Sequence, residues 1–194
     1  MPRLLLKDLP RYECLLEAAK EFPDLDPSAA EAFLHLLLTG DDVFAVTERN
    51  LADRSISHGR FGVLMLLWRS TQPRAATLMG ADDCAVGGPR TPAELAEAAG
   101  VTRATMTGLI DTLERDGLVK REPDPDDRRM MSVLLTPKGD KFLNEFLPGH
   151  FKLIAELMAP LSETERKTLV KLLVKIQGHA ASLRENAAAV PAHN

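Results

Sequence analysis

Residues 91–135 constrain the fold of this 194-residue chain more than any other segment, because they predict a helix, a tight turn, a second helix and then a hairpin. Thr91 suits the cap of the first helix, and Glu94 stands at the third helical position, as a capping box requires. Gly100 is suited to end this helix, and Thr102 to cap a second helix after three or four residues of turn. That spacing is typical of a helix-turn-helix.

The second helix has one apolar stripe and one free face. Helical spacing relates four apolar residues that we expect to be buried: Met106, Leu109, Ile110 and Leu113. The opposite face carries Ala104, Thr105, Gly108, Asp111, Thr112 and Arg115, with Arg103 and Thr107 on one flank. Gly117 supplies a left-handed residue that ends the helix, and Leu118 follows as its hydrophobic partner.

A hairpin is predicted next. The runs 118–121 and 130–135 are compatible with strands, and the intervening residues 122–129 are rich in Pro and Asp and therefore form a loop. Arg128 and Arg129 lie where the hairpin returns, a position from which they can reach a phosphate or a narrow minor groove.

These residues resemble the MarR family of bacterial winged-helix transcription regulators. The segment TPAELAEAAGVTRATMTGLIDTLERDGLV is similar to the DNA-binding helices of the family, and DPDDRR, residues 124–129, matches its wing signature. LTPKG, residues 135–139, resembles the exit from the wing into the next helix. The resemblance covers about residues 28–177. It implies a homodimer joined by the first and last helices, and a small-molecule pocket between these helices and the winged core, often for aromatic or phenolic compounds.

The remaining chain is predicted to be helical, with one interruption. Residues 1–27 form an arm of one or two short helices, and Asp26 and Pro27 cap a long helix over 28–52. Ser57 caps another helix with a stripe of Phe61, Leu64, Met65 and Trp68. After Trp68 the helical pattern fails, and residues 69–90 are interpreted as an inserted loop.

Beyond the wing, Thr136 and Pro137 begin a helix that Pro148 kinks or breaks. Ser162 and Glu165 form a second capping box for a last helix. The fold class is therefore mostly α with a small β-hairpin wing (α+β), a winged helix-turn-helix plus a helical dimerisation domain. We assign residues 57–136 to the DNA-binding domain, and residues 28–56 and 137–186 to the dimerisation region.

Composition excludes several classes of protein. The apolar runs are far shorter than the roughly 18 to 20 residues of a membrane span, and the N-terminus lacks a signal peptide, so we expect a cytoplasmic protein. Cys14 and Cys84 do not form a metal site with paired ligands, and no cofactor is predicted. The net charge of −4, and an excess of acids in residues 91–135, count modestly against non-specific nucleic-acid binding.

The predicted function is sequence-specific binding of double-stranded DNA at a palindromic or near-palindromic operator, since a two-fold dimer presents two recognition helices. The predicted contacts are Thr102, Arg103, Thr105, Thr107, Arg128 and Arg129, and Asp127 is a candidate ion-pair partner for one wing arginine. The recognition helix carries Gly108 and Thr112 where many relatives have basic residues. Candidates for the effector pocket are His35, Phe61, Met65, Trp68 and Phe151, each of which is also explained by a structural role.

Two alternatives remain open. A winged helix also serves as a protein-interaction module, although paired arginines in the wing favour DNA. Cys14 is a candidate for redox sensing, although a free cysteine is usually a small hydrophobe. We predict that the chain is not an enzyme, because no nucleophile, base and orienting group form a recognisable arrangement.

Overall fold

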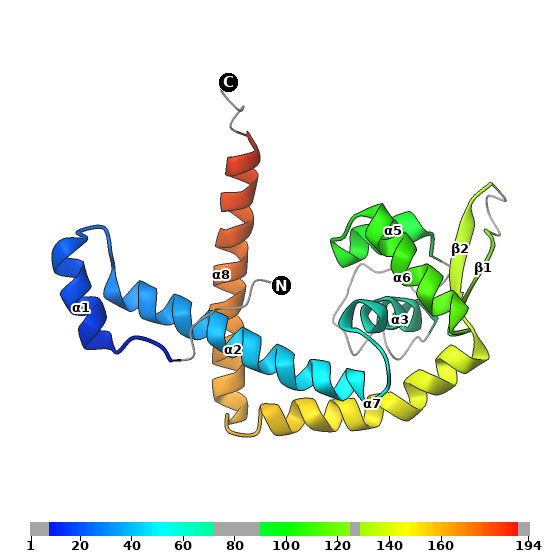
Figure 1. The fold of residues 1–194 in the computed structure, drawn as a ribbon, viewed down its shortest axis with the longest axis horizontal. Helices are drawn as coiled ribbons and strands as arrows, with labels where there is room; N and C mark the ends of the chain where they lie inside the picture. Colours follow the sequence, from blue (N-terminus) through cyan, green and yellow to red (C-terminus); the bar gives the residue numbers. More distant parts are fainter. Residues whose placement is uncertain (1–7, 72–89, 125–128, 190–194) are drawn as a thin grey trace. The chain divides into compact units, whose positions relative to one another are not determined.

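The computed structural model describes residues 8–71, 90–124 and 129–189. Its element order is α1 (Tyr12–Glu21), α2 (Pro27–Ala52), α3 (His58–Thr71), α5 (Pro92–Ala99), α6 (Arg103–Arg115), β1 (Val119–Pro123), β2 (Met131–Leu135), α7 (Pro137–Leu157) and α8 (Glu163–Ala189) (Figure 1). The predicted fold class, mostly α with one small hairpin, is confirmed. The chain divides into two compact units, Met1–Pro148 and Gly149–Asn194, and each is described by itself.

The described part of the N-terminal arm holds one helix, α1, which packs against α2. The Asp26 carboxylate accepts hydrogen bonds from the backbone N–H groups of Ser28 and Ala29, and Pro27 stands at the first position of α2. These contacts satisfy N–H groups that a helix leaves without partners at its start. They also lower the pKa of Asp26, with the Ser28 side chain as the largest cause. The predicted start of this helix is thus confirmed.

Helix α3 departs from its predicted limits and burial. It continues to Thr71, three residues past the point where the apolar pattern fails. Val63, Leu64 and Leu67 are its fully buried residues, whereas Phe61, Met65 and Trp68 pack against the core only partly buried. Because α3 contacts α2, α5, α6 and β2, no single stripe describes its buried surface.

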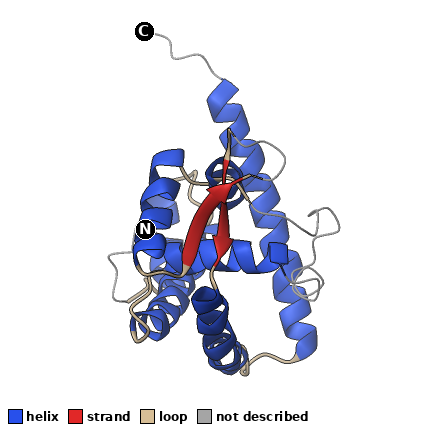
Figure 2. Cartoon of the chain, turned by 90° about the vertical axis from the view of Figure 1, so that its right-hand side faces the viewer, coloured by secondary structure: helices blue, strands red, loops and turns tan. Residues whose placement is uncertain are grey.

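The wing is a two-stranded antiparallel hairpin in which Val119 pairs with Leu135 and Pro123 with Met131 (Figure 2). Strand β1 is longer than predicted, because Glu122 and Pro123, expected in the loop, continue the ladder. Arg90, the last residue of the predicted insertion, forms an isolated antiparallel β-bridge with Val133 of β2. Its carbonyl accepts a 2.8 Å hydrogen bond from the Val133 N–H. Residues 69–71 of that predicted insertion belong to α3, and residues 72–89 lie outside the described residues.

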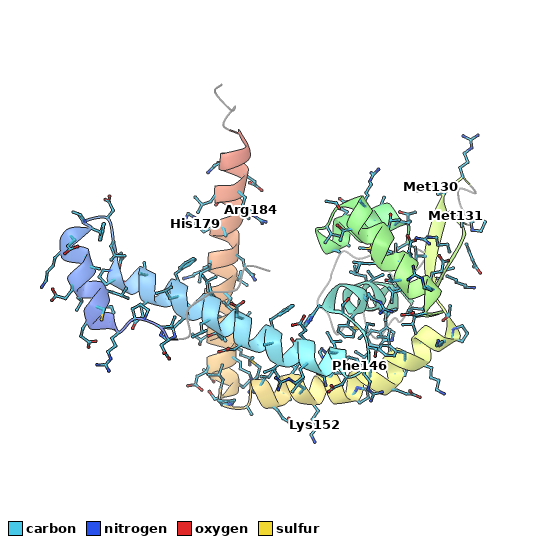
Figure 3. The ribbon with its side chains drawn as sticks, viewed as in Figure 1. Met130, Met131, Phe146, Lys152, His179 and Arg184 are labelled. Carbon is cyan, nitrogen blue, oxygen red and sulfur yellow. The ribbon has the colours of Figure 1, made fainter. Side chains whose placement is uncertain are left out.

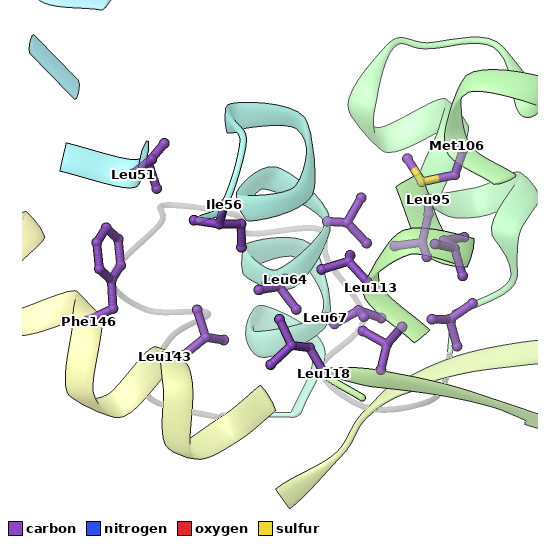
Figure 4. Close-up of a cluster of buried hydrophobic side chains, with 14 of the residues drawn as sticks. Leu51, Ile56, Leu64, Leu67, Leu95, Met106, Leu113, Leu118, Leu143 and Phe146 are labelled. Carbon is purple, nitrogen blue, oxygen red and sulfur yellow. The ribbon is translucent and has the colours of Figure 1, made fainter. Parts of the chain in front are cut away.

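The core joins the helix-turn-helix to the hairpin and to the first part of α7 (Figure 4). Leu95 of α5, Leu64 of α3 and Leu143 of α7 are completely buried. The α6 residues Met106, Ile110 and Leu113 are also completely buried, and Leu109 is partly buried, as the apolar stripe predicts. One face of the recognition helix α6 is therefore packed against the core along most of its length, and the opposite face is exposed.

Helix α7 is continuous through Pro148, so of the two predicted outcomes, a kink or a break, the break does not occur. The second capping box is confirmed, since the Ser162 N–H donates to Glu165 Oε2 over 2.8 Å and Glu165 N–H donates to Ser162 Oγ over 3.3 Å. The Ser162 side chain is the largest cause of a lowered pKa at Glu165. In α8 the apolar residues are mostly exposed, with Leu172 at 52% and Ile176 at 50%. None of the described helices has the length and hydropathy to cross a membrane.

Candidate nucleic-acid interface

The helix-turn-helix is built by hydrogen bonds between residues close together in the chain. Thr91 and Glu94 form the predicted capping box, with the Thr91 N–H donating to Glu94 Oε2 over 2.8 Å. Gly100 ends α5 with φ at 62°, a left-handed conformation that glycine adopts without strain. Thr102 then caps α6 by accepting a 3.1 Å hydrogen bond from the Thr105 N–H. This local geometry orients the start of α6.

The first turns of α6 present the predicted DNA-contact residues on one exposed surface. Arg103, Thr105 and Thr107 are all exposed, and no acidic residue occurs in the first turn. The Thr107 hydroxyl donates to the Arg103 carbonyl over 2.9 Å, so Thr107 can offer a partner its methyl group and its oxygen lone pairs. The partial positive charge of a helix N-terminus favours phosphate near Thr102 and Thr105.

The wing extends beyond the core. Met130 and Met131 lie toward the end of the hairpin and are 44% and 43% exposed (Figure 3). Arg129 is exposed beside them, whereas Asp127 and Arg128 lie outside the described residues, so their predicted ion pair is not described either. Two hydrogen bonds join the two strands where they enter the wing loop. The Asp124 N–H donates to the Met130 carbonyl over 2.9 Å, and the Ser132 hydroxyl donates to the Asp124 carboxylate.

An ionic network that was not predicted from the sequence links the recognition helix α6 to the wing. Arg121 of β1 donates to Asp111 Oδ1 over 2.5 Å and also pairs with the Glu114 carboxylate. Glu114 accepts a further 3.1 Å hydrogen bond from the Arg121 backbone N–H. Burial lowers the pKa of the Arg121 guanidinium, but the hydrogen bonds with Asp111 and Glu114 raise it, and the net shift is upward. The sequence feature that could have predicted this network is the pair of acids three residues apart on α6, Asp111 and Glu114, followed by Arg121 in the first strand.

Further contacts hold the C-terminal end of α6. The Asp116 carboxylate pairs with the guanidinium of Arg60 of α3. The backbone carbonyl of Asp116 accepts a 2.7 Å hydrogen bond from Lys138 Nζ of α7. Gly117 has φ at 72°, and the Leu118 N–H donates back to the Leu113 carbonyl over 2.9 Å, as predicted for this helix end. Helix α6 is thus connected to α3, the wing and α7 by polar groups around a buried apolar stripe.

The predicted effector-pocket residues have different environments. Met65 lines a cavity of about 430 Å³, and Phe61 packs edge-on against Phe146 at a centroid distance of 5.4 Å. Trp68 is partly buried against the core. His35 is exposed on α2, and Phe151, in the second unit, is 47% exposed. Phe44 and His58, which were not predicted as pocket residues from the sequence, also line the cavity.

The structure describes one of the two cysteines. Cys14 is an exposed free thiol on α1, and Cys84 lies outside the described residues. Among the residues that the structure describes, no cluster of three or more His, Cys, Asp or Glu side chains is arranged to hold a metal ion.

Comparison with known proteins agrees with this geometry. Residues 56–131 match the model of the MarR family. The chain is 37% identical over 168 residues to the HTH-type transcriptional repressor YetL of Bacillus subtilis (strain 168), a match that covers 87% of this chain and 92% of that protein.

Two solved structures illustrate the structural similarity. The MarR family transcription regulator SP03579 aligns with this chain with a TM-score of 0.62 at 20% identity. The alignment covers 87% of this chain and 98% of that one. BpsR of Bordetella bronchiseptica, whose DNA binding is regulated by 6-hydroxynicotinic acid, has a TM-score of 0.57 at 26% identity, covering 74% of this chain and 91% of that one. The winged helix, its exposed recognition helix and these relatives together show that the chain belongs to the MarR family of DNA-binding transcriptional regulators, which are not enzymes.

Proposed function

We propose that this protein is a homodimeric repressor that binds a palindromic or near-palindromic operator through α6 and the wing, and that a small ligand modulates this binding. The observation that carries the proposal is the exposed, capped N-terminal half of α6 beside an arginine-bearing wing. Similarity to a repressor over 87% of the chain supports repression as the mode of control.

The hydrogen-bonding groups of each exposed side chain suggest whether it contacts a base or the sugar-phosphate backbone of the operator. Arg103 at the start of α6 is suited to read a base edge, because a guanidinium binds guanine through two hydrogen bonds. Thr105 and Thr107 lie on the same exposed surface, and Thr102 with the helix N-terminus suits a phosphate. Arg128 and Arg129 of the wing complete the proposed interface, and their contacts are with the sugar-phosphate backbone or a narrow minor groove.

The exposed apolar side chains of the helices outside the winged core support dimerisation. Phe33 of α2 is 59% exposed, and Leu172 and Ile176 of α8 are half exposed. Large apolar side chains exposed on these helices are costly to leave in water, and a second copy of the chain would cover them. Two copies would place two α6 helices in successive major grooves about one helical turn apart, hence the palindrome.

Ligand control is proposed from the cavity next to the helix-turn-helix and from the relative BpsR, whose DNA binding responds to a small heteroaromatic acid. A ligand alters operator affinity only if it binds the DNA-competent and DNA-incompetent conformations with different affinities. The expected effect is therefore a change in operator Kd at saturating ligand, measured in a fixed salt concentration.

The test is a gel shift with DNA from upstream of the protein's own gene. We expect a sequence-selective shift that weakens as salt rises, because lysines and arginines displace counterions from phosphates. Replacing Arg128 and Arg129 with Ala should weaken binding to all sequences, whereas Arg103→Ala should relax preference at particular base pairs. If both variants bind the operator as the parent does, the assigned contacts are wrong, and no shift at low salt would favour a protein-interaction module.

A further inference from the structure

One face of the recognition helix α6 presents small side chains to the solvent. Ala104, Thr107, Gly108 and Asp111 stand at helical positions i, i+3, i+4 and i+7, so they share one face, and all four are exposed. A Cβ on Gly108 would meet no atom within 4 Å, which leaves open space among these side chains for the edge of a base. We call these four residues the methyl face.

Thr107 can accept a hydrogen bond from a base but has no proton left to donate. Its hydroxyl donates to the Arg103 carbonyl over 2.9 Å, and a hydroxyl has only one proton. The major-groove edge of guanine offers two acceptors, N7 and O6, so guanine is not a partner for the Thr107 oxygen. Thr107 is instead complementary to an exocyclic N–H group through its oxygen and to apolar surface through its methyl group.

The one acid of the methyl face, Asp111, is already paired with a cation. Asp111 Oδ1 accepts a 2.5 Å hydrogen bond from Arg121 of β1, so a positive charge lies beside the carboxylate and offsets its repulsion of DNA phosphates. A base that approaches this face therefore meets two methyl groups, those of Ala104 and Thr107, one accepting oxygen and the space at Gly108. Methyl groups of Ala and Thr are the usual partners of a thymine methyl group in the major groove.

We propose that the methyl face reads the C5-methyl group of a pyrimidine in the operator, an inference that rests on the proposed function of α6. The pyrimidine methyl packs against the methyl groups of Ala104 and Thr107, over the space at Gly108, and Thr107 Oγ1 accepts a hydrogen bond from an exocyclic amine. A thymine–adenine pair supplies the methyl group on one base and the amine on the other. A 5-methylcytosine carries both groups on one base, whereas guanine and unmethylated cytosine lack the methyl group.

The first experiment removes the methyl group from the DNA. The full-length protein selects its preferred duplex from a random-sequence pool, and each thymine of that duplex is then replaced singly by deoxyuridine, which pairs as thymine does and lacks only the methyl group. At the position that the methyl face reads, we expect the Kd to rise about threefold to fivefold, the contribution of one buried methyl group. If every uracil-containing duplex binds with the Kd of the selected one, the proposal is overturned.

The second experiment removes the methyl group from the protein. Thr107→Ser deletes the methyl group and keeps the hydroxyl that bonds to the Arg103 carbonyl. In this variant the Kd for the sensitive uracil duplex should exceed that for the thymine duplex by less than about twofold, because the two methyl groups no longer meet. Thr168→Ser is the matched control, since the exposed Thr168 hydroxyl of α8 donates to the Thr164 carbonyl over 3.0 Å, and it should keep the parent's ratio. A parent-like ratio in Thr107→Ser would exclude Thr107 as the reader.

The third experiment places cytosine, then 5-methylcytosine, at the sensitive thymine position, with guanine opposite. The methylated duplex should bind about threefold to fivefold more tightly than the unmethylated one, and no gain would refute recognition of the methyl group. Thr107→Val keeps a methyl group and lacks the oxygen. Its Kd for the methylated duplex should therefore be about threefold to tenfold higher than the parent's, the contribution of one hydrogen bond, and an unchanged Kd would overturn the accepting role of Thr107 Oγ1.

The salt dependence separates a methyl contact from an electrostatic effect. The Kd of every duplex should rise with salt, but the ratio of the Kd values for the uracil and thymine duplexes should stay constant, because a methyl group carries no charge. A ratio that falls as salt rises would overturn the methyl contact. Selective DNA binding without sensitivity to the pyrimidine methyl group would refute this inference alone, whereas a pool that yields no preferred duplex at low salt would refute the proposed function.

Discussion

Arg121→Gln isolates the ionic link between the wing and the recognition helix. The substitution removes the guanidinium that pairs with Asp111 and Glu114, while the backbone N–H of residue 121 can still donate to Glu114. Arg121 is 23% exposed and its partners are 51% and 38% exposed, so the lost contacts are neither fully buried nor freely solvated. We expect a loss of about 1–2 kcal/mol in the free energy of unfolding. At about 2–4 °C per kcal/mol, the melting temperature should fall by about 2–8 °C.

The effect on DNA binding has a separate origin. Without Arg121, two carboxylates on α6 are left uncompensated near the phosphates. At a separation of about 8 Å in water, each repels a phosphate by about 0.5 kcal/mol, so the two together weaken binding by about fivefold at low salt. The Debye length is about 8 Å at 0.15 M ionic strength, which reduces the effect to about twofold.

A fluorescence-anisotropy titration at several salt concentrations tests this reasoning, at a temperature well below the melting point of the variant. Adding Asp111→Asn and Glu114→Gln to Arg121→Gln should restore most of the operator affinity, because the repelling charges are then gone. Arg115→Gln serves as the comparison, since Arg115 is an exposed arginine of the same helix. If Arg121→Gln binds as the parent does at low salt, or if the triple variant binds no better than the single one, the electrostatic account is wrong.

Two further predictions follow from other parts of the fold. A Cβ on Gly139 would lie 2.1 Å from the Leu118 carbonyl oxygen, so Gly139→Ala should destabilise the protein by about 2–3 kcal/mol, whereas Gly149→Ala, with open space in the same helix, should leave the melting temperature nearly unchanged. Equal melting temperatures for the two variants would contradict this. If α8 forms part of a dimer interface, Leu172→Glu should yield monomers in sedimentation velocity and Lys175→Glu should not; a Leu172→Glu dimer of unchanged stability would count against that interface.

The helix-turn-helix could be predicted because its determinants are local. Thr91 and Thr102 each bond to groups three residues away, as Ser162 does at the start of α8, and Gly117 acts through its own backbone conformation. Such contacts depend on chain geometry that is the same in any protein. The apolar stripe of α6 was predictable for a similar reason, since this helix has one buried and one exposed face.

The errors lie where burial or pairing depends on distant segments. The buried face of α3 could not be read from periodicity, because α3 contacts several elements and buries Val63 and Leu67 completely but Phe61 only partly. Strand β1 includes Glu122 and Pro123 because β2 provides partners, although these residue types are rare in strands. Gly139 is required by the Leu118 carbonyl, 21 positions earlier, which no local rule reveals.

The acidic balance of residues 91–135 illustrates the same limit for the functional site. Net charge counts each carboxylate equally, but Glu94 is engaged in a capping box, Asp111 and Glu114 in the pairs with Arg121, and Asp116 in the pair with Arg60. These acids lie on α5, on the second half of α6 or at its C-cap, whereas the first turn of α6 holds Arg103 and no acid. A helix dipole adds partial positive charge at that same end. The proposed DNA-contact surface at the start of α6 therefore carries positive charge in a chain whose net charge is negative, and operator binding should depend on Arg103 and the wing far more than on net charge.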